Sequence, residues 1–205
     1  VLEAPNTVIM SEGTWISING DDAGLSAVGT ADKPIFFTGA VKERGSWERI
    51  DFDTTNNEIN RLEFVTVEYG GSTKHDANGA GVRATADSHG VTLSLSNTTI
   101  RESEGFGLFL TGSAIAPSFT KNVFTGNTLG PVTVGSQAAH LLDTTSLYTG
   151  NGVDHIRVRD NQVGKTVTWQ AVGVPYELEG SINVYEVWTL APGVTLLMPE
   201  AAWIH

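Results

Sequence analysis

The segments Leu95-Ser-Asn-Thr-Thr-Ile100 and Phe119-Thr-Lys-Asn-Val-Phe124 carry the pattern that decides the fold, two apolar residues five positions apart with polar residues between them. Two further pairs with this spacing are Leu62/Val67 and Leu142/Leu147. Successive pairs begin 33, 24 and 23 residues apart. A period of this kind has to be recognised first, because it determines the architecture of the whole chain.

A second apolar position follows each of the last three pairs at a fixed distance. The runs Gly107-Leu-Phe-Leu110, Pro131-Val-Thr-Val134 and His155-Ile-Arg-Val158 alternate in the way that strands do. Their central apolar residues, Leu108, Val132 and Ile156, lie 8, 8 and 9 residues beyond the preceding pair. The first interval is longer and contains Gly70–Gly79, which looks like an inserted loop.

A period of 23–24 residues with short strands at fixed offsets predicts an all-β fold, a parallel β-helix in which each turn of the chain stacks about 4.8 Å above the last. Leu62, Leu95, Phe119 and Leu142 would form one internal row. Val67, Ile100, Phe124 and Leu147 would form another. The Leu-x-x-Leu-x-Leu pattern of leucine-rich repeats is absent, and propeller blades need about twice the period. A two-sheet sandwich is the main rival architecture.

Composition narrows the function classes without naming one. The 205 residues contain no cysteine, 40% are hydrophobic, and the formal net charge is −11. An intrinsically disordered chain, a disulfide-linked scaffold and a cysteine-ligated metal site are therefore excluded. Nucleic acid is not an expected partner, since phosphate binding needs a basic surface. No apolar run approaches the roughly 20 residues of a membrane span.

The two ends of the sequence resemble one another. Thr7-Val-Ile-Met-Ser-Glu-Gly-Thr-Trp-Ile16 aligns with Thr195-Leu-Leu-Met-Pro-Glu-Ala-Ala-Trp-Ile204, 188 residues later. The two segments are either similar end turns of one solenoid or equivalent parts of successive modules in a tandem array, and we favour the array. We therefore divide the chain into a module at 1–175 and final turns at 176–205 that repeat the N-terminal Pro/Trp motif and, in an array, begin the next module.

The residues that follow the N-terminal segment carry a resemblance to a known group. Gly24-Leu-Ser-Ala-Val-Gly-Thr-Ala-Asp-Lys-Pro-Ile-Phe-Phe-Thr38 and Gly45-Ser-Trp-Glu-Arg-Ile-Asp-Phe52 resemble blocks of right-handed parallel β-helix proteins of the pectin lyase-like group on bacterial surfaces. Leu62-Glu-Phe-Val-Thr-Val-Glu-Tyr-Gly-Gly71 matches a further block. The resemblance implies the fold and a secreted or cell-surface, extracellular location. It does not imply an activity, because the group contains adhesins as well as enzymes.

The catalytic patterns of that group are not present in this chain. The pectin hydrolases of the group carry Asp-Asp, Asn-Thr-Asp and Gly-His-Gly sequences on successive turns. In this chain Asp21-Asp22 falls ahead of the regular turns, and Asn97-Thr98 is followed by Thr99 in place of Asp. Ser88-His89-Gly90 has Ser where Gly-His-Gly has its first Gly. No Arg-x-Lys occurs. A lyase would need a calcium cluster and a basic residue. Asp51 and Asp53 share one strand face, but an acidic surface explains them equally well, so we assign no catalytic residue, metal site or cofactor.

One outward surface is the candidate binding site. If Leu108, Val132 and Ile156 point inward, then Phe109, Thr133 and Arg157 point outward and stack, with Arg83 beside Phe109. His155 and Arg159 share the outward face of the last strand. An aromatic ring among three arginines suits an anionic sugar chain. The alternative to a binding site is that these side chains only cover solvated strand faces. Glu68 and Arg101 would be an ordinary cross-strand pair on a face of this kind.

These observations predict a non-catalytic, extracellular structural or adhesion module whose surface is a candidate for binding glycans. The partners expected are polysaccharide or another surface protein, together with neighbouring β-helix modules or end-to-end self-association, since open solenoid ends expose unpaired strands. The alternative is a polysaccharide lyase or hydrolase whose site is not recognisable from sequence.

Overall fold

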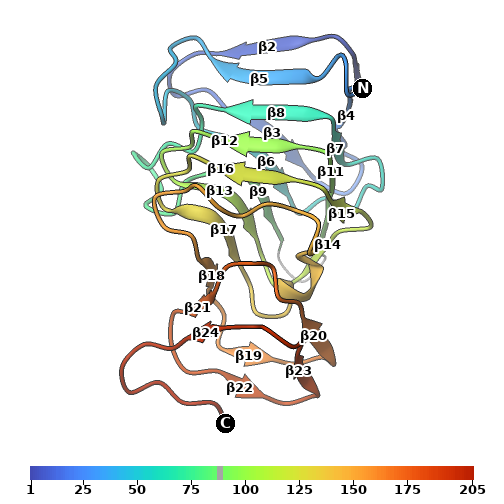
Figure 1. The fold of residues 1–205 in the computed structure, drawn as a ribbon. Coiled ribbons are helices and arrows are strands. Elements are labelled where there is room, and N and C mark those ends of the chain that lie inside the picture. Colours follow the sequence, from blue (N-terminus) through green and yellow to red (C-terminus); the bar gives the residue numbers. More distant parts are fainter. Residues whose placement is uncertain (87–89) are drawn as a thin grey trace.

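The computed structural model describes residues 1–86 and 90–205, and this part of the chain is all-β with parallel sheets (Figure 1). Every pair of named strands is parallel. Antiparallel pairing occurs at one isolated bridge, between Thr30 and Lys33. A single 3₁₀ turn, η1 (Ala139–Leu141), is the described helical element.

Three larger sheets account for most of the strands. Sheet 1 contains β1 (Leu2–Glu3), β4 (Ser26–Val28), β7 (Arg61–Glu63), β11 (Ser94–Ser96) and β15 (Phe119–Thr120). Sheet 2 contains β2 (Thr7–Met10), β5 (Ile35–Gly39), β8 (Val65–Glu68), β12 (Thr99–Arg101) and β16 (Val123–Thr125). Sheet 3 contains β3 (Ile16–Asn19), β6 (Ile50–Asp53), β9 (Ala80–Thr85), β13 (Phe106–Leu110), β17 (Gly130–Val134), β18 (Ile156–Val158), β21 (Tyr176–Leu178) and β24 (Leu196–Leu197).

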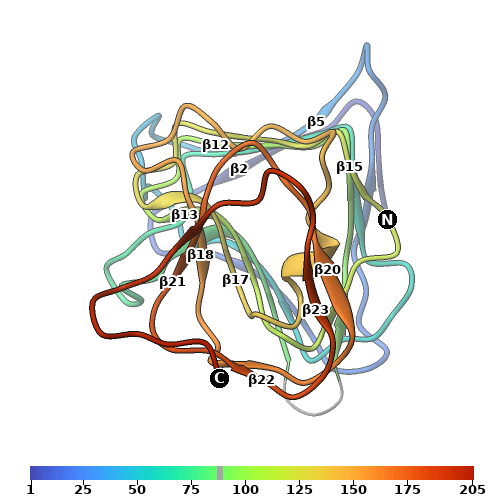
Figure 2. The same ribbon diagram turned by 60° about the horizontal axis from the view of Figure 1, so that its bottom comes forward.

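Three two-stranded pairs complete the sheets. They are β10 (Val91–Thr92) with β14 (Ala114–Ile115), β19 (Gln162–Val163) with β22 (Asn183–Val184), and β20 (Val167–Trp169) with β23 (Trp188–Leu190). From β1 to β17, strands of sheets 1, 2 and 3 follow one another in repeated order, so each sheet gains one strand per circuit. After β17, the circuits add strands to sheet 3 and to the two C-terminal pairs. The circuits lie over one another around a common interior (Figure 2).

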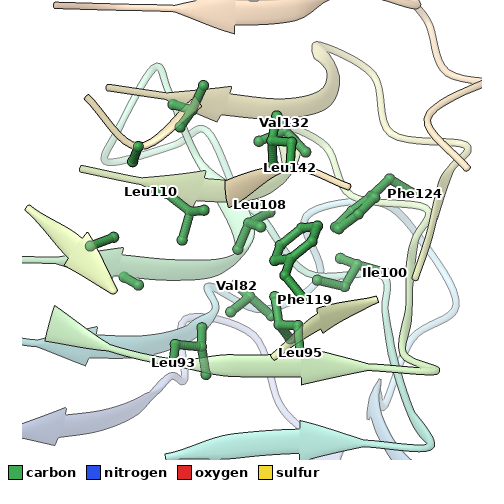
Figure 3. Packing of buried hydrophobic residues seen from close by; sticks show 14 of the residues in the cluster. Val82, Leu93, Leu95, Ile100, Leu108, Leu110, Phe119, Phe124, Val132 and Leu142 are labelled. Atoms are coloured by element: carbon green, nitrogen blue, oxygen red, sulfur yellow. The ribbon is translucent and has the colours of Figure 1, made fainter. Parts of the chain in front are cut away.

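The rows of apolar residues expected from the sequence are present in register. Leu62, Leu95 and Phe119 are paired across sheet 1, and Val67, Ile100 and Phe124 across sheet 2. In sheet 3, Val82, Leu108, Val132 and Ile156 are aligned. All of these side chains are buried in one hydrophobic core (Figure 3). The predicted inserted loop, 70–79, joins β8 to β9.

One member of the predicted second row is wrong. Leu147 is 59% exposed, whereas its neighbour Tyr148 is 1% exposed and stacks on Phe124. The reason is a one-residue shift in the turn before it, where the Asn122 N–H donates to Ser146 Oγ. That contact aligns Leu147 with Val123 and therefore turns the following ring inward.

The corners between strands use left-handed backbone at the same place in successive circuits. Phe64, Asn97 and Lys121 have φ of 50°, 49° and 54° between sheets 1 and 2. Non-glycine residues rarely adopt this region. Their recurrence shows that the bend itself repeats with the circuit, a regularity that the apolar pairs alone do not reveal.

The C-terminal circuits are shorter than the central ones. In sheet 3, Val132, Ile156, Tyr176 and Leu196 are aligned, and the spacing falls from 24 to 20 and 20 residues. Aromatic side chains fill the smaller interior. The ring centroid of Trp169 lies 5.0 Å from that of Tyr176 and 4.8 Å from that of Trp188.

The two similar terminal segments lie at opposite ends of the stack and on different sheets (Figure 1). Thr7–Met10 pairs with β5 in sheet 2, whereas Leu196–Leu197 pairs with β21 in sheet 3. The two segments therefore share sequence but pair in different sheets of this structure. Trp15 and Trp203 remain 59% and 61% exposed.

Candidate functional site

The outward row predicted on sheet 3 has the expected register. Arg83 pairs with Phe109, Phe109 with Thr133, and Thr133 with Arg157. Asp51 continues the row on the N-terminal side and Glu177 on the C-terminal side. These six positions follow one line across six parallel strands, with charged or aromatic side chains at all of them except the buried Thr133.

The arginines at the C-terminal end of this row cover aromatic rings. The Cζ atom of Arg157 lies 4.9 Å from the centroid of Phe106, and that of Arg159 lies 5.1 Å from the centroid of Phe109. Cation–π contacts at such distances are attractive. Phe106 and Thr133 are completely buried and Phe109 is half-buried, so the surface presents guanidinium groups over the rings and not the open aromatic face expected from the sequence.

These two arginines have only distant carboxylate neighbours among the described residues. The separations are 3.8 Å from Arg157 Nε to Glu177 Oε2 and 3.9 Å from Arg159 Nε to Glu179 Oε2, which exceed hydrogen-bonding distance. Nearby, the Nδ1 atom of half-buried His155 has no hydrogen-bond partner within the described structure. The guanidinium groups of Arg157 and Arg159 therefore retain hydrogen-bonding capacity for a ligand, whereas His155 Nδ1 is buried.

Arg83, by contrast, is fully engaged within the protein. Its Nε donates to Asp51 Oδ1 at 3.0 Å, and its Nη1 lies 3.4 Å from Asp76 Oδ2. The hydrogen bond to Asp51 raises the pKa of Arg83. Arg83 thus joins the sheet to the inserted loop, and of the five predicted binding residues it is the one least available to a ligand.

A second feature of sheet 3 was not predicted. At the N-terminal end of the sheet, a hollow of about 290 Å³ is lined by Gly13, Trp15, Glu48, Arg49 and His75. Hydrogen bonds from Glu48 N to Thr14 O and from Ile16 N to Arg49 O hold its two walls together. The sequence signals that could have indicated it are an exposed tryptophan beside a strand and the loop at 70–79.

Beneath this hollow lies a cluster of close charges. Arg49 approaches three carboxylates, at 3.7 Å from Asp51, 3.9 Å from Asp76 and 4.0 Å from Glu48. Glu48 Oε2 and the Nε and Nη1 atoms of Arg49 form no hydrogen bond within the described structure. Buried polar groups without hydrogen-bond partners are costly in free energy. We therefore treat this charge cluster and the hollow beside it as a second candidate site.

A separate buried carboxylate, Glu68, is structural. Thr38 Oγ1 donates to Glu68 Oε1 at 2.7 Å, and Arg101 Nη2 donates to Oε2 at 2.7 Å, as the expected cross-strand pair. Burial raises the pKa of Glu68, but the hydrogen bonds from Thr38 and Arg101 outweigh this and hold its pKa below the ordinary value. Both oxygens of Glu68 are therefore engaged in contacts within the protein.

The acidic residues considered for catalysis, as far as the structure describes them, are engaged in protein contacts or exposed in a turn. Asp53 accepts from Asn19 Nδ2 at 3.0 Å, and Asp51 is bound by Arg83, so the two carboxylates on β6 serve protein contacts. Asp21 is exposed in a turn. Across residues 1–86 and 90–205, no group of three or more His, Asp or Glu side chains is arranged to hold a metal ion. Ser88 and His89 lie outside the described residues.

No family model, curated protein or solved structure matches this chain. Within the part of the chain that the structure describes, no helix is long and apolar enough to cross a lipid bilayer.

Proposed function

We propose that the chain is a right-handed parallel β-helix module, similar to the pectin lyase-like group, and that it is a non-catalytic structural and adhesion module of a secreted or cell-surface protein. Right-handed connections are the rule for parallel strands in one sheet. The single observation that carries the proposal is sheet 3, whose eight parallel strands run from β3 to β24 in one continuous stack. Such a stack is a rigid spacer.

The open strand edges at both ends of the stack support a tandem array of modules. β2 and β3 each have one strand neighbour, as does β24 at the opposite end. Large apolar side chains are exposed on the terminal circuits, among them Ile9 at one end and Met198 at the other. Open edges of this kind need a cap or a neighbouring module, because unpaired strands otherwise associate. The repeat of 7–16 at 195–204 supplies such a neighbour in a tandem array.

A tandem chain tests the array. Residues 1–194 are joined to residues 7–205, so that the second copy begins at the position equivalent to Thr195. In a continuous solenoid the two modules share an interface, and we expect the tandem chain to unfold at a higher denaturant concentration than the single module, in one transition. Two independent transitions at the midpoint of the single module would overturn the array.

Binding of an acidic polysaccharide is the second function proposed, and it concerns Phe109, His155, Arg157 and Arg159, with Arg83 beside them. The observation in its favour is that Arg157 and Arg159 lie over aromatic rings without a hydrogen-bonded carboxylate among the described residues. We expect Arg157→Ala or Phe109→Ala to shorten retention on an acidic-polysaccharide column. Arg44→Ala, at another exposed site, is the control. Retention unchanged in both test variants would overturn the proposal.

The alternative to a non-catalytic module is a lyase or hydrolase acting on polysaccharide. Incubation with polygalacturonate, alginate and glycosaminoglycans, followed by assay for unsaturated products and new reducing ends, separates the two classes. We expect no product above a buffer control, and clear turnover of any of the three would replace the proposed function.

A further inference from the structure

The hollow at the N-terminal end of sheet 3 has the components of a binding site for a neutral sugar. We propose that Trp15, Glu48, Arg49 and His75 bind one pyranose ring of a neutral glycan, with the indole of Trp15 against the sugar face and the charged pair beneath contacting its hydroxyl groups. This site is separate from the arginine row, and the structural role proposed above does not depend on it.

Trp15 is exposed although a neighbouring circuit lies beside it. Trp15 has the next circuit on its C-terminal side, where Ile16 N donates to Arg49 O, and it is 59% exposed. Its counterpart Trp203 has a circuit on the opposite side, where its backbone N–H donates to Ser181 Oγ, and it is 61% exposed. The tryptophan of this motif is therefore exposed at both ends of the stack.

The polar groups that line the hollow beside the indole are held in place. The side chains of Glu48 and Arg49 are only 8% and 14% exposed. Glu48 Oε2 and the Nε and Nη1 atoms of Arg49 are buried, so a ligand meets the remaining, hollow-lining parts of these two side chains. A fixed carboxylate accepts from vicinal hydroxyls and a fixed guanidinium donates to them, whereas an indole packs against the C–H face of the ring. Burial keeps both groups ordered, which lowers the entropy cost of binding.

The size and charge of the hollow select a small neutral ligand. Its volume of about 290 Å³ lies at the lower limit of small-molecule sites, which suits one sugar ring with its neighbour at the opening. The adjacent charges are the carboxylates of Glu12, Glu48, Asp51 and Asp76 against the cations Arg49, Lys74 and Arg83. One negative charge in excess disfavours uronic acids and sulfated sugars. His75 forms part of the rim from the inserted loop.

Titration with defined trisaccharides tests the site. Cellotriose, maltotriose, mannotriose and chitotriose are the neutral probes and trigalacturonate is the acidic one, followed by saturation-transfer NMR and by tryptophan fluorescence. We expect at least one neutral trisaccharide to bind and to do so more tightly than trigalacturonate. Trp15→Ala should weaken that binding by about tenfold or more, since a tenfold change corresponds to about 1.4 kcal/mol.

Two further variants make the result decisive. Trp203→Ala removes an equally exposed tryptophan far from the hollow and should leave binding unchanged, whereas Glu48→Gln should weaken it without altering the circular dichroism spectrum. The inference is overturned if no neutral trisaccharide binds at millimolar concentration, if trigalacturonate binds more tightly, or if Trp15→Ala and Trp203→Ala behave alike. None of these outcomes bears on the unfolding of the tandem chain, so the two proposals fail separately.

Discussion

The ring of Tyr148 stacks on that of Phe124, with centroids 5.5 Å apart and planes 11° from parallel. Phe124 in turn lies 6.1 Å from Phe119 of its own circuit, so three aromatic rings from two successive circuits pack together inside the stack. The Tyr148 hydroxyl donates to Asp143 O at 3.2 Å, which satisfies its polar end. Burial raises the pKa of this hydroxyl, which therefore stays protonated.

Replacing Tyr148 by Ala should lower the free energy of unfolding by about 3–5 kcal/mol, the range observed for large aromatic residues in cores. Leu147→Ala, one position away but 59% exposed, should change it by no more than about 0.5 kcal/mol. Urea unfolding of both variants measures the difference. Equal effects of the two substitutions would show that the inward residue is wrongly assigned.

Asn127 connects three circuits through its side chain. Its Nδ2 donates to Ile100 O at 3.2 Å and its Oδ1 accepts from Ser103 N at 3.1 Å, both in the preceding circuit. Its Nδ2 also donates to Asn151 Oδ1 at 3.0 Å in the next circuit, and the side chain is completely buried. Asn127→Ala leaves a buried carbonyl and a buried N–H without partners. Since each such group costs about 1–3 kcal/mol, we expect a loss of about 2–4 kcal/mol in urea unfolding. Asn161→Ala, at an exposed position between β18 and β19, serves as the control and should be neutral.

The sequence predicted the parts of the fold that depend on periodic burial. Leu95, Ile100 and Leu108 recur at fixed offsets because each circuit must bury the same positions, and their rows are in the expected register. The position of Tyr148 was missed because an offset measured from Leu142 assumes turns of equal length. Only the contact of Asn122 with Ser146 shows that this turn contains one more residue.

The candidate sites were less accessible to sequence reasoning. The outward row was found because it alternates with the inward one, but the folding of Arg157 over Phe106 depends on side-chain conformation, which alternation does not specify. The hollow brings together Trp15, Arg49 and His75 from a turn, a strand entry and an inserted loop. Such proximity follows from the length of each circuit, and the early circuits are too irregular to predict it.

The ionisation of Glu68 should make the free energy of unfolding depend on pH. Its pKa is lowered in the folded protein from an ordinary value of 4.5, so the folded state binds this proton less readily than the unfolded state. The resulting stabilisation is therefore complete above pH 4.5 and is lost as the pH falls from there through the folded pKa. The difference in unfolding free energy between the native chain and Glu68→Gln should be larger at pH 7 than at pH 3. A difference that is constant with pH would contradict this, and Glu200→Gln, at an exposed carboxylate, is the control.

Gly105 occupies a position where the backbones of two circuits meet. A Cβ atom added there would lie 1.7 Å from Gly79 O, far inside van der Waals contact, and the neighbouring atoms belong to the main chain. The strain cannot be relieved by a side-chain rotation, because the circuit that contains β13 would have to move away from the loop that precedes β9. Gly105→Ala should therefore unfold at a much lower urea concentration than the native chain or fail to fold. Gly180→Ala separates this effect from a general sensitivity to losing glycine, since Gly180 has no atom within 4 Å of its added Cβ and no left-handed φ. If both alanine variants unfold at the same urea concentration as the native chain, the circuits that contain β9 and β13 are not in close contact. The pairing of Arg83 with Phe109 requires that contact.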